Sequence, residues 1–256
     1  YGLVGSEMCI RDSLRFHPQI MLSEPKEIFF FSRLKNPAHP RFESAELSWY
    51  LRHFREPLAR RLAKSTVTLR RCRELYRPIV RGEATASYAA MDTDLIDEVV
   101  TLKPDVRVIM MIRDPVDRAW SHAKKDLVRK TGRRVDQVPA EEFRQFFRDE
   151  YQVSCARYVR NHDNWQERLR PGHLYVGAFE EITRRPHELM LEVMSFLGVR
   201  SDRRYVSSDV HEEVNPTAKS SVPVEYRAYL EDLFGEEIAA LEARFGYRGA
   251  AGQRTN

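Results

Sequence analysis

An arginine and a serine eight residues apart stand where a buried strand is expected to give way to a helix. The apolar run Val106–Ile112 has the length and β-branched content of a buried strand, so Arg113 falls at its carboxyl end. Open α/β sheets bind ligands at that edge. Asp114-Pro115 predicts a turn into a helix that carries Ser121. The guanidinium fork and the hydroxyl could therefore converge on one phosphate group.

The same residues also allow a purely structural interpretation. Arg113 could pair with a nearby carboxylate such as Asp117, and Ser121 could be an ordinary surface residue. The whole segment, IRDPVDRAWSH, resembles the 3′-phosphate-binding segment of sulfotransferases that use 3′-phosphoadenosine 5′-phosphosulfate (PAPS). This resemblance implies that PAPS is the co-substrate and that Arg113 and Ser121 hold its 3′-phosphate.

A second segment resembles the K-E-x-x-F-F motif of carbohydrate sulfotransferases. It reads Lys26-Glu27-Ile28-Phe29-Phe30, and we expect a strand over Lys26–Ser32. The resemblance implies that Glu27 removes the proton from the acceptor hydroxyl and that Lys26 lies beside the acceptor. It also favours a glycan over a phenol, because the phenol-directed branch typically uses a histidine base. Alternatively, Glu27 could be a solvent-exposed residue paired with Lys26.

Three later segments extend the resemblance. Gly82–Tyr88 (GEATASY) is similar to a G-E-x-[ST]-P-x-Y segment that borders the acceptor cleft, although alanine replaces the proline. It implies that Glu83 and Thr85 contact the acceptor, although Glu83 could instead hold the loop. In Ser154–Trp165, Tyr158 is expected to line the nucleotide site, and the tryptophan is expected to be core. Lys219, in a late loop, is a candidate for a phosphate contact, but it could equally be an exposed loop lysine.

Basic residues near these motifs could surround an acceptor cleft for an anionic glycan, although a solvated charged face is the ordinary explanation. They are Arg33, Lys35, Arg41, Lys124, Lys125, Arg129, Arg133 and Arg134.

Both ends of the chain differ in character from the rest of the sequence. Gly5–Asp12 can be back-translated to a common sequencing adapter, so we expect residues 1–13 to be an artefact. Residues 14–248 are expected to form a sulfotransferase domain that lacks its first strand and its 5′-phosphosulfate loop, since no glycine-rich phosphate loop appears. Residues 249–256 are expected to be a disordered tail.

The amino-acid composition excludes few classes of protein. The 256 residues include 42 basic and 38 acidic ones, a net charge of +4, which suits an anionic nucleotide and is modest for a protein that binds only polyanions. No apolar run is long enough to span a membrane, and we expect a cytoplasmic protein. No metal-ligand spacing is present, and no metal is expected. Cys72 and Cys155 could form a disulfide or remain reduced.

The order of expected elements indicates the fold class. Strands alternate with helices of ten or more residues, which predicts an α/β protein with a mostly parallel sheet and helices on both faces. This agrees with the sulfotransferase fold, a P-loop nucleoside triphosphate hydrolase-like architecture. The expected elements are the connection Phe16–Leu22, helices over Phe42–Leu62, Thr93–Leu102, Pro115–Lys130, Pro139–Tyr151, Ser154–Leu169, Arg185–Leu197 and Val224–Phe245, and strands over Val106–Ile112 and His173–Phe179.

Together these features predict transfer of a sulfuryl group from PAPS to a hydroxyl of a glycan or similar small acceptor, with no nucleic-acid partner. Two alternatives stay open. A P-loop-type nucleotide kinase would prefer ATP over PAPS. A non-catalytic polyanion-binding protein would show a steep salt dependence and no preference for a 3′-phosphate.

Overall fold

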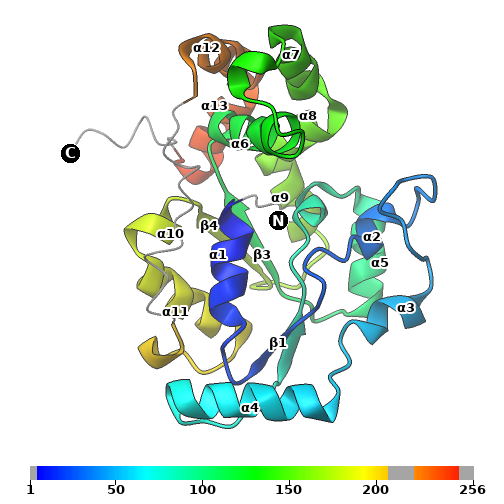
Figure 1. Ribbon diagram of the computed structural model, residues 1–256, viewed down its shortest axis with the longest axis vertical. Coiled ribbons are helices and arrows are strands. Elements are labelled where there is room, and N and C mark those ends of the chain that lie inside the picture. The colour runs from blue at the N-terminus through cyan, green and yellow to red at the C-terminus, as the bar shows by residue number, and fades with distance from the viewer. Residues whose placement is uncertain (1–4, 207–221, 248–256) are drawn as a thin grey trace.

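The computed structural model describes residues 5–206 and 222–247, with side chains from residue 10 onward. Within these ranges the strands form two parallel pairs (Figure 1). β1 (Ile20–Leu22) pairs with β2 (Val80–Gly82), and β3 (Val108–Ile112) pairs with β4 (Leu174–Ala178). The expected α/β class with parallel strands is therefore confirmed.

Helices make up most of the rest of the described chain. The α-helices are α1 (Gly5–Leu14), α2 (Phe30–Arg33), α3 (Leu47–Arg52), α4 (Leu58–Cys72), α5 (Thr93–Leu102), α6 (Pro115–Ala123), α7 (Ala140–Arg148), α8 (Glu150–Ala156), α9 (Tyr158–Gln166), α10 (Glu181–Arg184), α11 (Pro186–Leu197), α12 (Val224–Leu233) and α13 (Gly235–Phe245). Short 3₁₀ or π turns are η1 (Ala86–Ala90), η2 (Lys124–Arg129), η3 (Val135–Gln137) and η4 (Arg203–Tyr205). In Figure 1, α4 lies at one end of the molecule, and α7, α8 and α12 lie at the other.

Alternate side chains of β3 enter two different hydrophobic clusters. Val108 and Met110 pack with residues of α5 and α9, whereas Ile109 and Met111 pack with residues of α1 and α11. Successive residues of a strand point to opposite faces of a sheet. Helices therefore cover both faces of the β3–β4 pair, as the sequence predicts.

The strand expected over Lys26–Ser32 is wrong. Glu27 and Phe29 adopt left-handed backbone angles, with φ of 57° and 58°, which a strand does not contain. Only the one-turn helix α2 is regular in this segment. Phe30 and Phe31 are buried there, in an aromatic cluster with neighbouring rings rather than in a sheet.

Other boundaries also differ from expectation. Phe16–Leu22 contains β1, a strand of three residues that is too short to stand out in the sequence. The helix expected over Phe42–Leu62 is two helices, because Pro57 caps the start of α4 and cannot continue a preceding helix. The helix expected over Pro139–Tyr151 ends early, because the carboxylate of Asp149 accepts a hydrogen bond from the Tyr151 backbone N–H and so caps α8.

The last expected helix, Val224–Phe245, is broken between α12 and α13 at Phe234, whose backbone leaves the helical region. The helix at Pro115 begins as predicted, and α6 continues into the π turn η2. α5 has the predicted bounds. Neither Cys72 nor Cys155 forms a disulfide within the described residues. None of the helices in the described residues combines the length and the apolar character needed to cross a membrane.

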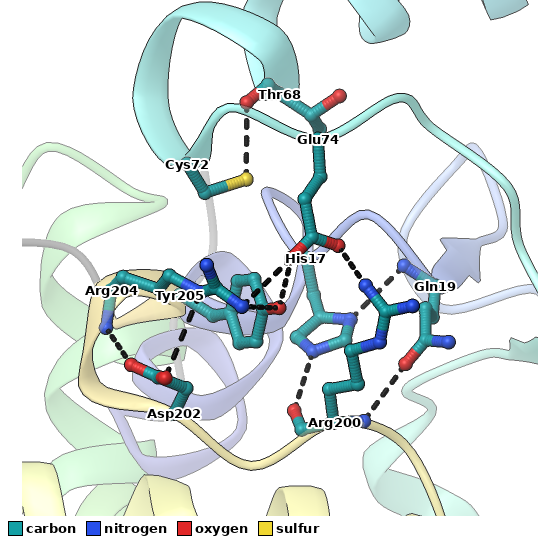
Figure 2. A network of polar contacts seen from close by, with 9 residues as sticks. All are labelled: His17, Gln19, Thr68, Cys72, Glu74, Arg200, Asp202, Arg204 and Tyr205. Carbon is teal, nitrogen blue, oxygen red and sulfur yellow. Dashed lines mark hydrogen bonds and ion pairs between the residues drawn. The ribbon is translucent and has the colours of Figure 1, made fainter.

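A polar network with His17 and Tyr205 at its buried centre ties the segment after α11 to the chain before β1 (Figure 2). His17 is 0% exposed, and its Nδ1 accepts a hydrogen bond from the Gln19 backbone N–H at 3.1 Å. Its Nε2 therefore carries the proton and donates to the Arg200 carbonyl oxygen at 2.9 Å. Beside it, the Glu74 carboxylate accepts a hydrogen bond of 2.6 Å from the Tyr205 hydroxyl. Burial lowers the pKa of His17, so the neutral ring belongs to the native fold.

Candidate functional site

Arg113 follows β3 directly, and its guanidinium has no carboxylate partner among the residues that the structure describes. The guanidinium lies over the ring of Phe179, 4.3 Å from the ring centroid. The backbone N–H of Phe179 donates to the Ile112 carbonyl oxygen at 2.7 Å, which fixes the ring beside Arg113. The alternative pair with Asp117 does not form, because Asp117 pairs with Arg227, with 3.1 Å between Oδ1 and Nη2. A cation held on an aromatic face is suited to an anionic ligand.

The helix that carries Ser121 is started by a strong local signal. The Asp114 side chain accepts hydrogen bonds from the next two available backbone N–H groups of α6, at 2.9 and 3.0 Å, and proline occupies the first position. Ser121 is half-buried, and within the described part of the chain its hydroxyl has no hydrogen-bond partner. Lys124 is buried nearby; its pKa is lowered by burial and by the charge of Arg113. Two cations, Arg113 and Lys124, therefore lie close enough to interact at the end of β3.

Tyr158 lies behind this site rather than in an open space. Its ring is buried in a cluster with Ile112, Leu241 and Tyr247. Burial raises the pKa of Tyr158 to about 12, and a hydrogen bond with the backbone N–H of Arg113 acts in the opposite direction. The phenol thus supports the backbone that carries Arg113.

A polar cleft of about 480 Å³ lies next to these elements. It combines residues that follow β1, β2 and β3, because the carboxyl ends of the strands carry the loops that line it. The lining residues are Glu27, Phe29, Arg33, His39, Arg41, Ala86, His122, Lys125, Asp126, Leu127, Lys130, Glu142, Gln145, Phe146, Asp149, Tyr151 and Gln152.

Glu27 lines this cleft and has no ion-pair partner among the described residues. Its backbone N–H donates to the Ala84 carbonyl oxygen at 3.1 Å, so the residue is tied to the segment after β2. Lys125 lines the same cleft; burial lowers its pKa, and the charges of Asp126 and Glu27 partly offset that effect. Glu27 therefore faces the cleft with a cation in electrostatic range.

Glu83 and Thr85 are placed differently from Glu27. The Glu83 carboxylate is buried and accepts hydrogen bonds from the hydroxyls of Thr85 (2.7 Å), Tyr50 (2.8 Å) and Tyr88 (3.1 Å). A further hydrogen bond comes from the backbone of Ile28. Burial raises the pKa of Glu83, and these donors act against that rise. Neither Glu83 nor Thr85 lines the cleft, which favours the loop-holding role over contact with an acceptor.

The other carboxylates of the cleft are occupied. Asp126 forms an ion pair with Lys130, with 2.7 Å between Oδ1 and Nζ, and its Oδ2 lies 3.6 Å from Nε2 of His122. Glu142 forms a two-pronged ion pair with Arg133, and the Asp149 side chain caps α8. By contrast, three cations of the lining have no carboxylate partner among the described residues: Arg33, Arg41 and Lys125. The cleft is therefore ionic, with uncompensated positive charge around Glu27.

Sequence reasoning missed the residues that α8 contributes. Gln152 joins two elements, since its backbone oxygen accepts from Arg118 at 2.8 Å and its side-chain oxygen lies 3.1 Å from Nδ1 of His122. The spacing of His122, Asp126 and Lys130 at four-residue intervals was the one local signal that could have shown this network.

Of the predicted site residues, Glu27 lines the cleft, whereas Arg113, Ser121 and Tyr158 do not. Lys26 is half-buried and does not line it. Lys219 lies outside the described residues. In the described ranges no group of three or more His, Cys, Asp or Glu residues is arranged to hold a metal ion.

These features define an α/β protein with a polar site at the carboxyl ends of parallel strands. A family model described as "Sulfotransferase domain" matches residues 26–239, and the chain therefore belongs to the sulfotransferase domain family. The fold is similar to a crystal structure of a sulfotransferase from Alicyclobacillus acidocaldarius, with 23% identity, a TM-score of 0.65, and coverage of 98% of this chain and 97% of that one.

The sulfotransferase domain from the curacin biosynthetic pathway is a second solved structure with this fold. It has 12% identity and a TM-score of 0.53, and the alignment covers 97% of this chain and 96% of that domain. At these identities the likenesses show the fold alone. No curated protein gives a significant match to the chain.

Proposed function

We propose that this sulfotransferase uses PAPS as its donor and binds the 3′-phosphate with Arg113 and Ser121. The proposal rests on Arg113 at the end of β3. Its guanidinium lies over Phe179 and has no carboxylate partner among the described residues. The hydroxyl of Ser121, on the helix that follows, has no hydrogen-bond partner among them either. A guanidinium and a hydroxyl without protein partners among the described residues are available to a phosphate, which supports the proposal. Lys219 remains a candidate for a further phosphate contact.

In the proposed reaction, Glu27 acts as the general base. It takes the proton of an acceptor hydroxyl while the hydroxyl oxygen forms a bond to sulfur. The bond between sulfur and the bridging oxygen of the 5′-phosphate breaks, and adenosine 3′,5′-bisphosphate leaves with the electron pair. Lys125, which lies in electrostatic range of Glu27, can stabilise charge on the transferring group. Tyr158 and Glu83 support this arrangement without touching the reacting atoms.

We further propose a glycan, or another polar acceptor rich in hydroxyls. The cleft supports this class because charged side chains line it, and three of its cations, Arg33, Arg41 and Lys125, have no carboxylate partner among the described residues and suit an acceptor with acidic groups. Transfer of labelled sulfate from PAPS to neutral glycans, uronate-containing glycans and 4-nitrophenol would test this. Preferential labelling of the phenol would contradict the proposal.

Donor binding tests the core of the proposal directly. Calorimetry should show that adenosine 3′,5′-bisphosphate binds, that adenosine 5′-monophosphate binds much more weakly, and that Arg113→Ala removes the difference. Arg170→Ala, an exposed arginine far along the chain, is the matched control. Equal binding of the two nucleotides would refute the 3′-phosphate site.

The same titrations separate the alternatives. A nucleotide kinase would bind ATP in preference to the bisphosphate. A polyanion-binding protein would bind heparin with a steep salt dependence and would be indifferent to the 3′-phosphate.

A further inference from the structure

The helix α4 presents apolar side chains to solvent at the end of the molecule away from α6, α7 and α8, which help to line the cleft (Figure 1). Leu58 is 71% exposed, Leu62 59% and Leu69 50%. At 100° per residue these three leucines fall within about 40° of arc on the helix. Only Thr68 and Cys72 of α4 are buried, so packing against the domain does not explain the leucines.

The segment that joins α4 to β2 also exposes apolar side chains to solvent. Leu75 is 51% exposed and Ile79 62%. Val67 of α4 is also 42% exposed, so six large aliphatic side chains are exposed between residues 58 and 79, a concentration that a stable fold does not need.

Basic residues surround this apolar surface. Residues 55–79 contain eight basic and two acidic residues, a net charge of +6. Both carboxylates are already occupied: Glu56 pairs with Lys64, with 2.6 Å between Oε1 and Nζ, and Glu74 pairs with two arginines of the segment after α11. Arg61 and Arg70 of α4 are exposed and have no ion-pair partner among the described residues. The surface therefore keeps most of its positive charge.

From this combination we infer that α4 and the segment after it form a docking surface for an anionic lipid membrane. A helix that lies in a membrane interface needs apolar side chains that enter the lipid and cations that meet the headgroups, and α4 offers both without a single acidic residue. A second copy of the chain is disfavoured as the occupant, since two surfaces with a net charge of +6 repel each other. Soluble polyanions would use the arginines but leave the leucines exposed to water.

The inference does not depend on the proposed function, because α4 contributes no residue to the cleft. It is tested by sedimentation of the whole chain with vesicles of phosphatidylcholine alone and with vesicles that contain 30% phosphatidylglycerol. We expect binding to the anionic vesicles and little to the neutral ones. Binding should weaken at least tenfold in Leu58→Gln/Leu62→Gln/Leu69→Gln, and also in Arg61→Gln/Arg70→Gln.

Val224→Gln is the matched control, because Val224 is 86% exposed in another part of the molecule. Circular dichroism of each variant checks that it is folded, and substitutions on so exposed a helix face should not unfold it. Equal binding of wild type and the leucine variant to anionic vesicles would overturn the inference. So would binding to heparin without binding to vesicles, or a dimer in analytical ultracentrifugation that the leucine variant abolishes.

Discussion

The backbone N–H of Glu27 donates a hydrogen bond of 3.1 Å to the carbonyl oxygen of Ala84. This bond joins the loop after β1 to the segment after β2, and Glu83, the residue before Ala84, receives a second bond from the backbone of Ile28. Two adjacent residues of one loop are thus fixed by two adjacent residues of the other. Glu27 has a φ of 57°, so its place in the cleft depends on this support.

We therefore expect Glu83→Ala to destabilise the fold by about 3 kcal/mol, because it removes a buried acceptor from three hydroxyls and one backbone N–H. Tyr50→Phe, which removes one of those donors, should cost about 1 kcal/mol. Urea unfolding followed by circular dichroism measures both. Glu98→Ala, an exposed residue of α5, is the control and should change the free energy of unfolding by less than about 0.5 kcal/mol. A Glu83→Ala protein as stable as the control would show that the network contributes nothing.

Glu27→Gln separates catalysis from binding. The amide keeps the size of the side chain but cannot accept a proton, so sulfuryl transfer to the acceptor found in the glycan panel should fall about 10²- to 10⁴-fold. Affinity for adenosine 3′,5′-bisphosphate should be unchanged, as measured by calorimetry. Retention of a third of the wild-type rate would exclude Glu27 as the base.

Local signals explain what could be predicted from the sequence. The strand that ends before Arg113 and the start of a helix at Pro115 depend on residues that are neighbours in the chain, and both appear in the structure. The Glu83 network could not be predicted in this way, because Tyr50 donates to Glu83 across 33 positions. The same holds for His17 and Arg200, which are 183 positions apart.

The wrong strand at Lys26–Ser32 has a different cause. A run of aromatic residues fits a strand or a packed helix turn equally well when only periodicity is considered. The rings of Phe30 and Phe31 contact Tyr50, from a helix twenty positions later, and that packing decides the conformation. Tertiary contacts therefore set the geometry around Glu27, whereas the role proposed for Glu27 rests on its motif.

Arg113 and Ser121 should act as a coupled pair in donor binding. Arg113→Ala should weaken binding of adenosine 3′,5′-bisphosphate about 10- to 100-fold, and Ser121→Ala about 2- to 10-fold. Because both are proposed to contact one phosphate, the double variant should lose less than the product of the two effects. Calorimetry on the wild type, the two single variants and the double variant measures this coupling. Fully additive losses would mean that the two side chains serve different groups.

The buried network around His17 makes stability depend on pH in a defined direction (Figure 2). Burial lowers the pKa of His17 in the folded state, whereas an unfolded histidine titrates near 6.5. Below pH 6.5 the imidazole of His17 therefore binds a proton in the unfolded chain but not in the native protein. The free energy of unfolding consequently falls as the pH falls.

Between pH 7.5 and 5.5 this group can remove at most about 1.4 kcal/mol from the free energy of unfolding. His17→Gln should be less pH-dependent than the wild type over that interval, in urea unfolding at both pH values. Tyr205→Phe is the matched control, because it removes the hydroxyl bonded to Glu74 in the same network without removing a group that titrates there. It should lower stability equally at both pH values. If His17→Gln and the wild type lose the same amount of stability on acidification, the pH dependence arises from other residues, and His17 is only a packing and hydrogen-bonding group.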